Sequence, residues 1–362
     1  MRVLIVGGTN FIGPHVLGWL AEAGHEVVLF HRGRTEADLP PLVKHIRGDR
    51  QSLGDFGSEF RRFAPEVVLD MIPMNEVDAR GLVAAFRGIA RRTVAISSQD
   101  VYRAYDRVTR RGPGPPDRIP LSEDAPLREK LYPYEREGVA DYEKILVERV
   151  VMGDPDLPGT VLRLPAVYGP GDYQHRLFQY LKRMDEGRPA ILIGEGMASW
   201  RWTHGYVEDV ALAIALAVTD EHAAGRVYNV GEADPPPWAG WVREIGAAAG
   251  WDGEVVAVPG YVLPKHLDWG LDTAQYWVAD TTRIRRELGY REAVPRGAAL
   301  RKTVEWELAN PPEKVDLALF DYAAEDATLA GLSTSFPSGQ RGAARIPCSL
   351  TADGPSDVAE DR

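Results

Sequence analysis

The chain has 362 residues, 44% of them hydrophobic and 26% charged, which is the composition of a globular protein with room for about two domains. Its 53 acidic residues against 42 Lys and Arg give a net charge of −11, and this balance argues against sequence-independent nucleic-acid binding, which needs a basic surface. The single cysteine, Cys348, excludes an internal disulfide and a cysteine-based metal site, and no histidine spacing predicts a metal centre. No run of about 18 apolar residues predicts a membrane span, so we expect a cytoplasmic protein without metal, membrane or nucleic-acid partners.

The first 30 residues predict the opening of a parallel sheet. A β-branched run at 2–6 leads into glycines, then an apolar-periodic helix from Phe11 to Ala23, then a second strand at 26–30. Further short apolar runs predict strands at 43–46, 66–70, 93–97 and 160–164, with helices at about 76–90 and 136–152 between them. Strands that alternate with helices in this way indicate an α/β fold with a Rossmann-type doubly wound parallel sheet.

The second half of the chain predicts a smaller C-terminal α+β domain laid over the carboxyl ends of the main strands. Residues 103–133, rich in Pro, Gly, Arg and Asp, predict a long loop near the sheet edge. The helices expected after it are at 174–186, 207–219, 236–250 and 296–309, with short apolar runs at 190–193, 226–230 and 254–258. We therefore divide the chain into a nucleotide-binding domain at 1–170 with a returning segment near 203–230, a substrate-binding part at 171–310, and a tail at 311–362. A helix at 315–330 is an open alternative within that tail, and 331–362 is expected to be disordered.

The glycine-rich turn after the first strand predicts a dinucleotide site. Gly7, Gly8 and Gly13 lie in VGGTNFIG, where they allow a tight turn and a close approach of helix to strand. The exposed N–H groups of the turn and the helix N-terminus suit a pyrophosphate, so we expect Thr9, Asn10, Phe11 and Ile12 to contact the cofactor. Asn10 replaces the usual middle glycine and tolerates left-handed backbone angles. The alternative is a tight turn in an α/β protein that has lost its nucleotide.

The end of the second strand favours NADP over NAD, with NAD still possible. An NAD enzyme usually places an acid there to accept from the ribose 2′-hydroxyl, but this chain has Arg32 and Arg34 and no acid before Glu36. Guanidinium groups suit a 2′-phosphate, although both arginines could also be solvated loop residues. Asp49 could cap a turn or accept from the adenine amine.

Several motifs in order resemble the extended short-chain dehydrogenase/reductase family, which includes nucleotide-sugar epimerases and dehydratases, over roughly residues 1–310. They are GGTNFIG at 7–13, SSQDVY at 97–102, the Lys144-x-x-x-Glu148 pair, LRLPAVYGPGD at 162–172, THGYVEDVALAI at 203–214 and ADTTRIRRELGY at 279–290. The combination with FHRG is similar to an atypical branch in which some members have altered catalytic groups. Plant members of that branch associate with RNA, a property that the acidic charge here argues against transferring.

The resemblance implies a set of catalytic residues with one gap. It places Ser98 where the family binds the reacting oxygen, Asp100 where a catalytic acid or base can lie, and Lys144 at the lysine of the Tyr-x-x-x-Lys pair. The tyrosine of that pair is replaced by Ala140. Tyr142 would lie about 200° around a continuous helix from the required face, so a core or edge aromatic is its favoured role, and a catalytic role would need a local change. Tyr132 and Tyr134 just before the helix, or Asp100 itself, are the other candidates for the missing proton carrier.

The substrate side departs from the family as well. Ala166 stands where the family often has a substrate-binding Asn, and Trp202 occupies the slot of an arginine that grips a nucleotide diphosphate. Arg201 or Arg176 could replace that arginine, and Trp202 could stack on a flat or sugar ring or pack at a rim.

Two functions therefore remain open. One is an NAD(P)-dependent oxidoreductase or epimerase/dehydratase acting on a sugar-like or nucleotide-sugar hydroxyl or carbonyl. The other is a cofactor-binding sensor or scaffold without catalysis. The resemblance also implies a homodimer.

Overall fold

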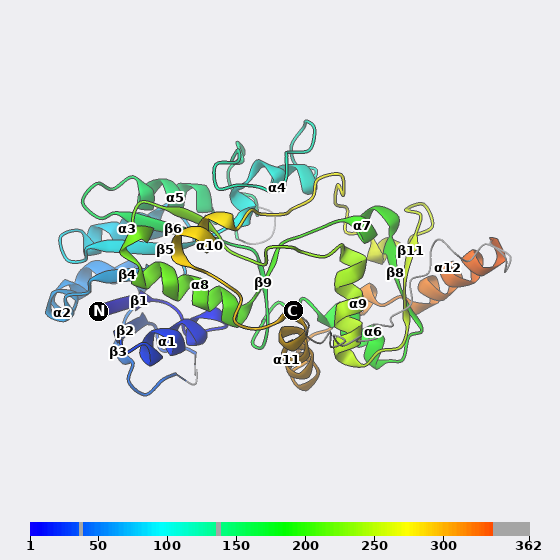
Figure 1. Ribbon diagram of the computed structural model, residues 1–362, viewed down its shortest axis with the longest axis horizontal. Helices are drawn as coiled ribbons and strands as arrows, with labels where there is room; N and C mark the ends of the chain where they lie inside the picture. Colours follow the sequence, from blue (N-terminus) through cyan, green and yellow to red (C-terminus); the bar gives the residue numbers. More distant parts are fainter. Residues whose placement is uncertain (36–38, 135–138, 336–362) are drawn as a thin grey trace, which may run out of the picture.

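The computed structural model describes residues 1–35, 39–134 and 139–335 and shows a seven-stranded parallel sheet as its centre (Figure 1). The strand order is β10-β6-β5-β4-β1-β2-β3, so the order reverses between β1 and β4 as in a doubly wound fold. The strands are β1 (Arg2–Val6), β2 (Glu26–His31), β3 (Lys44–Arg47), β4 (Val67–Asp70), β5 (Arg92–Ser98), β6 (Gly159–Leu164) and β10 (Val227–Asn229). The predicted α/β class and Rossmann-type sheet are confirmed.

Helices cover both faces of this sheet. Alternate residues of β1 point to opposite faces, with Val3 and Ile5 in one apolar cluster and Leu4 and Val6 in another. The first cluster includes residues of α1 (Ile12–Glu22) and α8 (Val207–Thr219), and the second includes residues of α3 (Glu76–Phe86). On the α3 side lie also η1 (Arg50–Phe56), α2 (Gly57–Phe63) and α5 (Lys144–Met152). Because both faces are buried, the strands are nearly continuous apolar runs rather than alternating ones.

A smaller mixed part lies at one end of the molecule (Figure 1). Its two-stranded parallel sheet pairs β8 (Ala190–Gly194) with β11 (Glu254–Val258), and a second pair joins β7 (Ala166–Tyr168) to β9 (His204–Tyr206). The helices of this part are α6 (Phe178–Asp185), α7 (Glu195–Ser199), α9 (Trp238–Ala249), α11 (Arg296–Ala309) and α12 (Tyr322–Ser335), with the short turns η4 (Lys265–Leu267) and η5 (Leu317–Leu319). The chain returns to the main sheet through α8, η3 (Glu221–Ala223), β10 and α10 (Thr282–Leu288).

Three segments differ from the sequence-based expectations. The predicted loop at 103–133 begins with a helix, α4 (Arg103–Val108), after the short turn η2 (Gln99–Val101), because Tyr102, Tyr105 and Leu121 bury their side chains there. The helix expected at 136–152 starts only at Lys144, where the Glu143 carboxylate caps it by accepting from the Ile145 N–H. In the tail, where a helix at 315–330 is an open alternative, α12 begins later and extends to Ser335, while residues 336–362 lie outside the described part of the chain.

The described residues contain neither a helix suited to a membrane nor a cluster of metal-binding side chains. None of their helices combines the length and the apolar character that crossing a membrane requires. Nor do these residues bring together three or more His, Cys, Asp or Glu side chains in a way that could hold a metal ion.

Candidate dinucleotide cavity and active site

The glycine turn after β1 brings helix and strand into very close contact. Gly7 and Gly8 adopt φ angles of 79° and 90°, which favour glycine. A Cβ atom built on Gly13 would lie 2.1 Å from the Gly8 carbonyl oxygen, so only glycine fits where α1 begins. The turn therefore has the close backbone approach that a pyrophosphate needs at a helix N-terminus.

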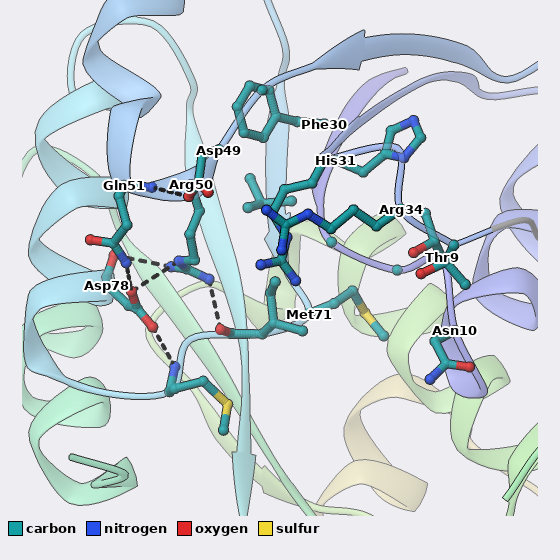
Figure 2. Close-up of a pocket in the computed structure, with 18 of the residues that line it drawn as sticks. Thr9, Asn10, Phe30, His31, Arg34, Asp49, Arg50, Gln51, Met71 and Asp78 are labelled. Carbon is teal, nitrogen blue, oxygen red and sulfur yellow. Dashed lines mark hydrogen bonds and ion pairs between the residues drawn. The ribbon is translucent and has the colours of Figure 1, made fainter. Parts of the chain in front are cut away.

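A cavity of about 740 Å³ opens beside this turn. Thr9, Asn10, Phe11 and Ile12 line it together with Gly7, whereas Gly13 is not part of the lining. Figure 2 shows Thr9 and Asn10 at this part of the cavity. The cavity continues past the end of β2 to the start of η1, which places Arg32 and Asp49 on its lining as well. A cradle that a Cβ atom would fill, joined to an elongated cavity at the carboxyl ends of parallel strands, fits a dinucleotide.

The far wall of the cavity carries a fixed cation that sequence reasoning missed. Arg50 donates to both carboxylate oxygens of Asp70, at 3.0 and 2.9 Å, and forms an ion pair of 3.1 Å with Asp78. Figure 2 shows Arg50 and Gln51 turned toward Asp78, with Thr9 and Asn10 across the cavity. Asp49 caps η1 by accepting from the Gln51 N–H at 3.0 Å. The packing of η1 against α3 brings Arg50 and Asp78 together, and no local sequence motif predicts this contact.

A buried carboxylate lies just beyond β5. Asp100 is 2% exposed, and its Oδ2 accepts hydrogen bonds from the hydroxyls of Tyr142, at 3.0 Å, and Tyr134, at 3.1 Å. Its Oδ1 is buried without a hydrogen-bond partner among the described residues, and its backbone N–H donates to Ser98 Oγ at 3.2 Å. Burial raises the pKa of the Asp100 carboxyl, although the nearby Arg128 charge acts in the opposite direction. The structure thus brings together Ser98, Asp100 and Tyr142.

Lys144 completes the group from the first residue of α5. Its ammonium donates to the carbonyls of Pro73, at 2.6 Å, and Ile96, at 3.0 Å, and lies 5.4 Å from the centre of the Tyr142 ring. Burial lowers the pKa of Lys144 to about 8, because only neutral carbonyls contact the ammonium directly. Pro73 immediately precedes Met74, which lines the dinucleotide cavity, so the lysine lies next to the cavity wall.

The structure changes the argument about Tyr142. Because α5 begins at Lys144, Tyr142 lies before the helix, and the angular separation of about 200° on a continuous helix does not apply. Its hydroxyl instead reaches Asp100 from the turn that precedes α5. Ala140 is exposed, and Tyr134 joins the cluster as one of the alternatives open at the sequence level, whereas Tyr132 has an exposed side chain.

The predicted substrate residues lie apart from this cluster. Arg201 donates to the Pro235 carbonyl at 2.7 Å, and Arg176 forms an ion pair of 2.6 Å with the buried Asp172. Both guanidinium groups are therefore already engaged. The Trp202 ring stacks on Trp277 with centroids 5.3 Å apart and an interplanar angle of 2°.

Ring contacts connect Trp202 to the buried carboxylate. Trp277 lies 5.3 Å from Tyr105, Tyr105 lies 5.8 Å from Tyr134, and Tyr134 lies 5.2 Å from Tyr142. Trp277 and Tyr105 were missed by sequence reasoning, because aromatic residues distant in the chain give no spacing signal. The ring contacts form one continuous aromatic series from Trp202 to Tyr142, whose hydroxyl reaches Asp100.

Comparison with known proteins identifies the family. The profile of the NAD dependent epimerase/dehydratase family matches residues 3–231. The chain belongs to this family. The match includes both the glycine turn and the Asp100–Lys144 cluster, so the expected resemblance is confirmed.

Individual relatives are distant. The 2′-dehydrokanamycin reductase of Streptomyces kanamyceticus is 27% identical over 74% of this chain and 72% of its own length. The chloroplast stem-loop binding protein of 41 kDa b from Arabidopsis thaliana is 23% identical over 80% of this chain and 75% of its own. Among solved structures, the UDP-glucose 4-epimerase of Thermus thermophilus in complex with NAD matches with a TM-score of 0.62 and 24% identity, over 86% of this chain and all of that one. The last likeness supports the Rossmann-type fold.

Proposed function

We propose that the chain is an NAD(P)-dependent oxidoreductase or epimerase/dehydratase acting on a hydroxyl or carbonyl carbon of a sugar-like ligand. The observation that carries this proposal is the position of two features at the carboxyl ends of strands in the same parallel sheet. One is the dinucleotide cavity after β1 and β2, and the other is the buried Asp100–Lys144 group after β5. A bound nicotinamide dinucleotide would supply the hydride acceptor or donor. Relatives named for UDP-glucose epimerisation and for reduction of 2′-dehydrokanamycin support a sugar-like ligand.

The residues of the turn, with Lys144, would hold the cofactor, and we propose a preference for NADP. Arg32 and Arg34 line the cavity with exposed side chains. Within residues 1–35, 39–134 and 139–335, no carboxylate forms an ion pair with either guanidinium. Two uncompensated positive charges at the end of β2 favour a 2′-phosphate over a ribose hydroxyl.

Asp100 is the proposed base, with Tyr142 as its partner. Burial first, and then the Asp100 charge, raise the pKa of Tyr142 well above its usual value, so its hydroxyl stays protonated at neutral pH and can donate but not accept a proton. A phenolate is the base in the usual Tyr-x-x-x-Lys arrangement, and it would not form here. Asp100 has the unpartnered oxygen and the raised pKa that suit a carboxylate base, with Ser98 beside it to orient the reacting oxygen.

On the substrate side we propose stacking rather than a diphosphate clamp. Arg201 and Arg176 already have partners, while the Trp202–Trp277 pair offers ring surface on which a sugar can pack. A homodimer and a cytoplasmic location remain predictions. Size-exclusion chromatography with light scattering will test the first of these.

The alternative function is a cofactor-binding protein without catalysis, and Ala140 favours it. An exposed alanine stands at the position of the family's proton-transferring tyrosine, and Ala166 stands at the position of its asparagine. If Asp100 and Tyr142 do not transfer a proton, binding of cofactor would remain without turnover.

The experiment that separates the two combines binding with hydride transfer. Calorimetry with NADPH and NADH measures cofactor binding, and absorbance at the nicotinamide band follows turnover with a panel of sugar-like alcohols and ketones. We expect binding, and turnover that Lys144→Ala abolishes and that Tyr142→Phe reduces more than Tyr134→Phe. Tight binding with no turnover on any substrate, together with gained activity in Ala140→Tyr, would establish the silent alternative.

A further inference from the structure

A histidine pair lies at the end of β2, beside the two arginines. His31 is the last residue of β2, and its Nε2 lies 2.9 Å from Nδ1 of His45 on β3. Strand register brings the two together, since β2 and β3 pair Leu29 with His45 and His31 with Arg47. One ring must donate and the other accept in the neutral pair, so the two rings share a single proton along this hydrogen bond.

The second nitrogen of His31 is unpaired among the described residues. His31 lines the dinucleotide cavity, and its Nδ1 is buried with no hydrogen-bond partner in the described part of the chain. Figure 2 shows the imidazole on the same side of the cavity as Arg34. A buried polar atom without a partner is costly, so a polar ligand group that reached this nitrogen would gain by binding.

The charges around the pair are mostly positive. On β3 His31 faces His45 and Arg47, and the turn that follows β2 carries Arg32 and Arg34. Arg50 of η1 pairs with Asp70 of β4 and Asp78 of α3, which together leave one negative charge, and the Asp49 carboxylate caps the Gln51 N–H. Burial, then His45 and then Arg47 lower the pKa of His31, so the His31 ring is neutral at neutral pH when no anion is bound.

We propose that the His31–His45 pair takes up a proton when the 2′-phosphate of NADPH binds, so that the preference for NADPH over NADH rises as the pH falls. The proposal rests on the dinucleotide cavity and the NADP preference of the proposed function. A phosphate dianion beside the pair stabilises its cationic form, and protonation turns the imidazoles into donors alongside Arg32 and Arg34. NADH has no 2′-phosphate and gains nothing from that proton.

The direction in which NADPH affinity changes with pH separates proton uptake by the histidine pair from titration of the phosphate itself. A phosphate monoester loses its second proton near a pKa of about 6, which strengthens its binding to cations as the pH rises. Proton uptake by histidine weakens NADPH binding as the pH rises. Between about pH 6.5 and pH 8.5 the phosphate is already mostly a dianion, so a loss of affinity there reports the protein.

Isothermal titration of the full-length chain with NADPH and with NADH tests the proposal. Measurements from pH 6.5 to pH 8.5, in two buffers of different ionisation enthalpy, give both the dissociation constant and the number of protons taken up. For wild type we expect NADPH binding to weaken with pH by up to about tenfold per unit, the limit for one proton, with proton uptake on binding, while NADH binding stays flat.

Two variants and one control test whether the pH dependence of NADPH binding comes from the histidine pair. His31→Asn and His45→Gln each remove one ring and should flatten the NADPH profile, so the test survives if one of them fails to fold. His222→Gln changes an exposed histidine paired with Asp220, which lies on η3 outside the cavity lining, and should keep the wild-type profile.

The outcomes are distinguishable. NADPH and NADH profiles of equal slope, or NADPH binding without proton uptake, would overturn the histidine proposal and leave the enzyme assignment intact. Binding of neither dinucleotide would overturn the proposed function, and the histidine proposal with it.

Discussion

At the scale of single residues, the candidate site contains a buried carboxyl group, Asp100, and a buried amine, Lys144. Burial disfavours the charged form of each. Burial raises the pKa of Asp100 and lowers the pKa of Lys144 to about 8, so the two pKa values move toward neutral pH from opposite sides. Groups poised in this way suit proton transfer at physiological pH.

This arrangement predicts a pH profile of kcat/KM with two limbs. Asp100 must be ionised to act as a base, so activity falls as the pH drops through its raised pKa. Lys144 must be charged, so activity also falls as the pH rises through about 8. Asp100→Asn should lower kcat by about 10²–10⁴-fold and remove the acidic limb. Lys144→Arg, where it folds and turns over, should move the basic limb upward because guanidinium stays protonated.

Asp185→Asn, an exposed carboxylate at the end of α6, serves as the control and should leave both limbs in place. A wild-type profile that stays level from pH 7 to pH 10 would count against a role for the Lys144 charge.

At the scale of elements, the start of α1 determines whether the dinucleotide cavity forms. The Gly8 carbonyl lies where a side chain at position 13 would have to be, and backbone atoms cannot turn aside as a flexible side chain can. A glycine later in the same helix, Gly18, has nothing within 4 Å of its Cβ position.

Gly13→Ala should therefore displace the turn and weaken NADPH and NADH binding by at least about tenfold, measured by calorimetry. Gly18→Ala is the matched control, with unchanged binding and up to about 1 kcal/mol of added stability from helix propensity. Equal affinities in the two variants would show that the turn does not contact the cofactor.

What the sequence predicts well is what local residues dictate. The apolar runs, the glycine turn and the helix at 207–219 follow from periodicity and backbone requirements, and the structure places them where expected. The helix predicted from 136 starts only at Lys144, because the capping by Glu143 depends on a side-chain contact that periodicity does not reveal. The contact of His31 with His45 depends on strand register, which no short segment encodes.

At the scale of the whole molecule, α12 attaches to the end that lies away from the dinucleotide cavity (Figure 1). Glu325 on α12 is 1% exposed and accepts from Arg183 of α6 at 2.7 Å and pairs with His266 at 3.0 Å. The predicted tail is therefore in part a structural element, because removing a buried carboxylate would leave a buried guanidinium without its counterion.

Glu325→Gln should lower the free energy of unfolding by about 3 kcal/mol, measured by chemical denaturation, because the charge of Arg183 then stays buried without compensation. NADPH affinity should remain unchanged, since none of these side chains lines the cavity. Glu313→Gln, an exposed carboxylate in the segment before η5, is the control and should alter neither quantity. A variant as stable as wild type would show that α12 is not held by this ion pair.

The path of the chain has a consequence for how such a protein can be divided. Strand β10 pairs with β6 at the edge of the main sheet, yet it comes from beyond β8 and α7 of the smaller part. A cut after residue 170 would separate the first six strands from their seventh, and it would take α8 away from α1. Each of the two parts is therefore built from more than one segment of the chain. Recombination can exchange their loops, but it cannot exchange either part as one continuous segment.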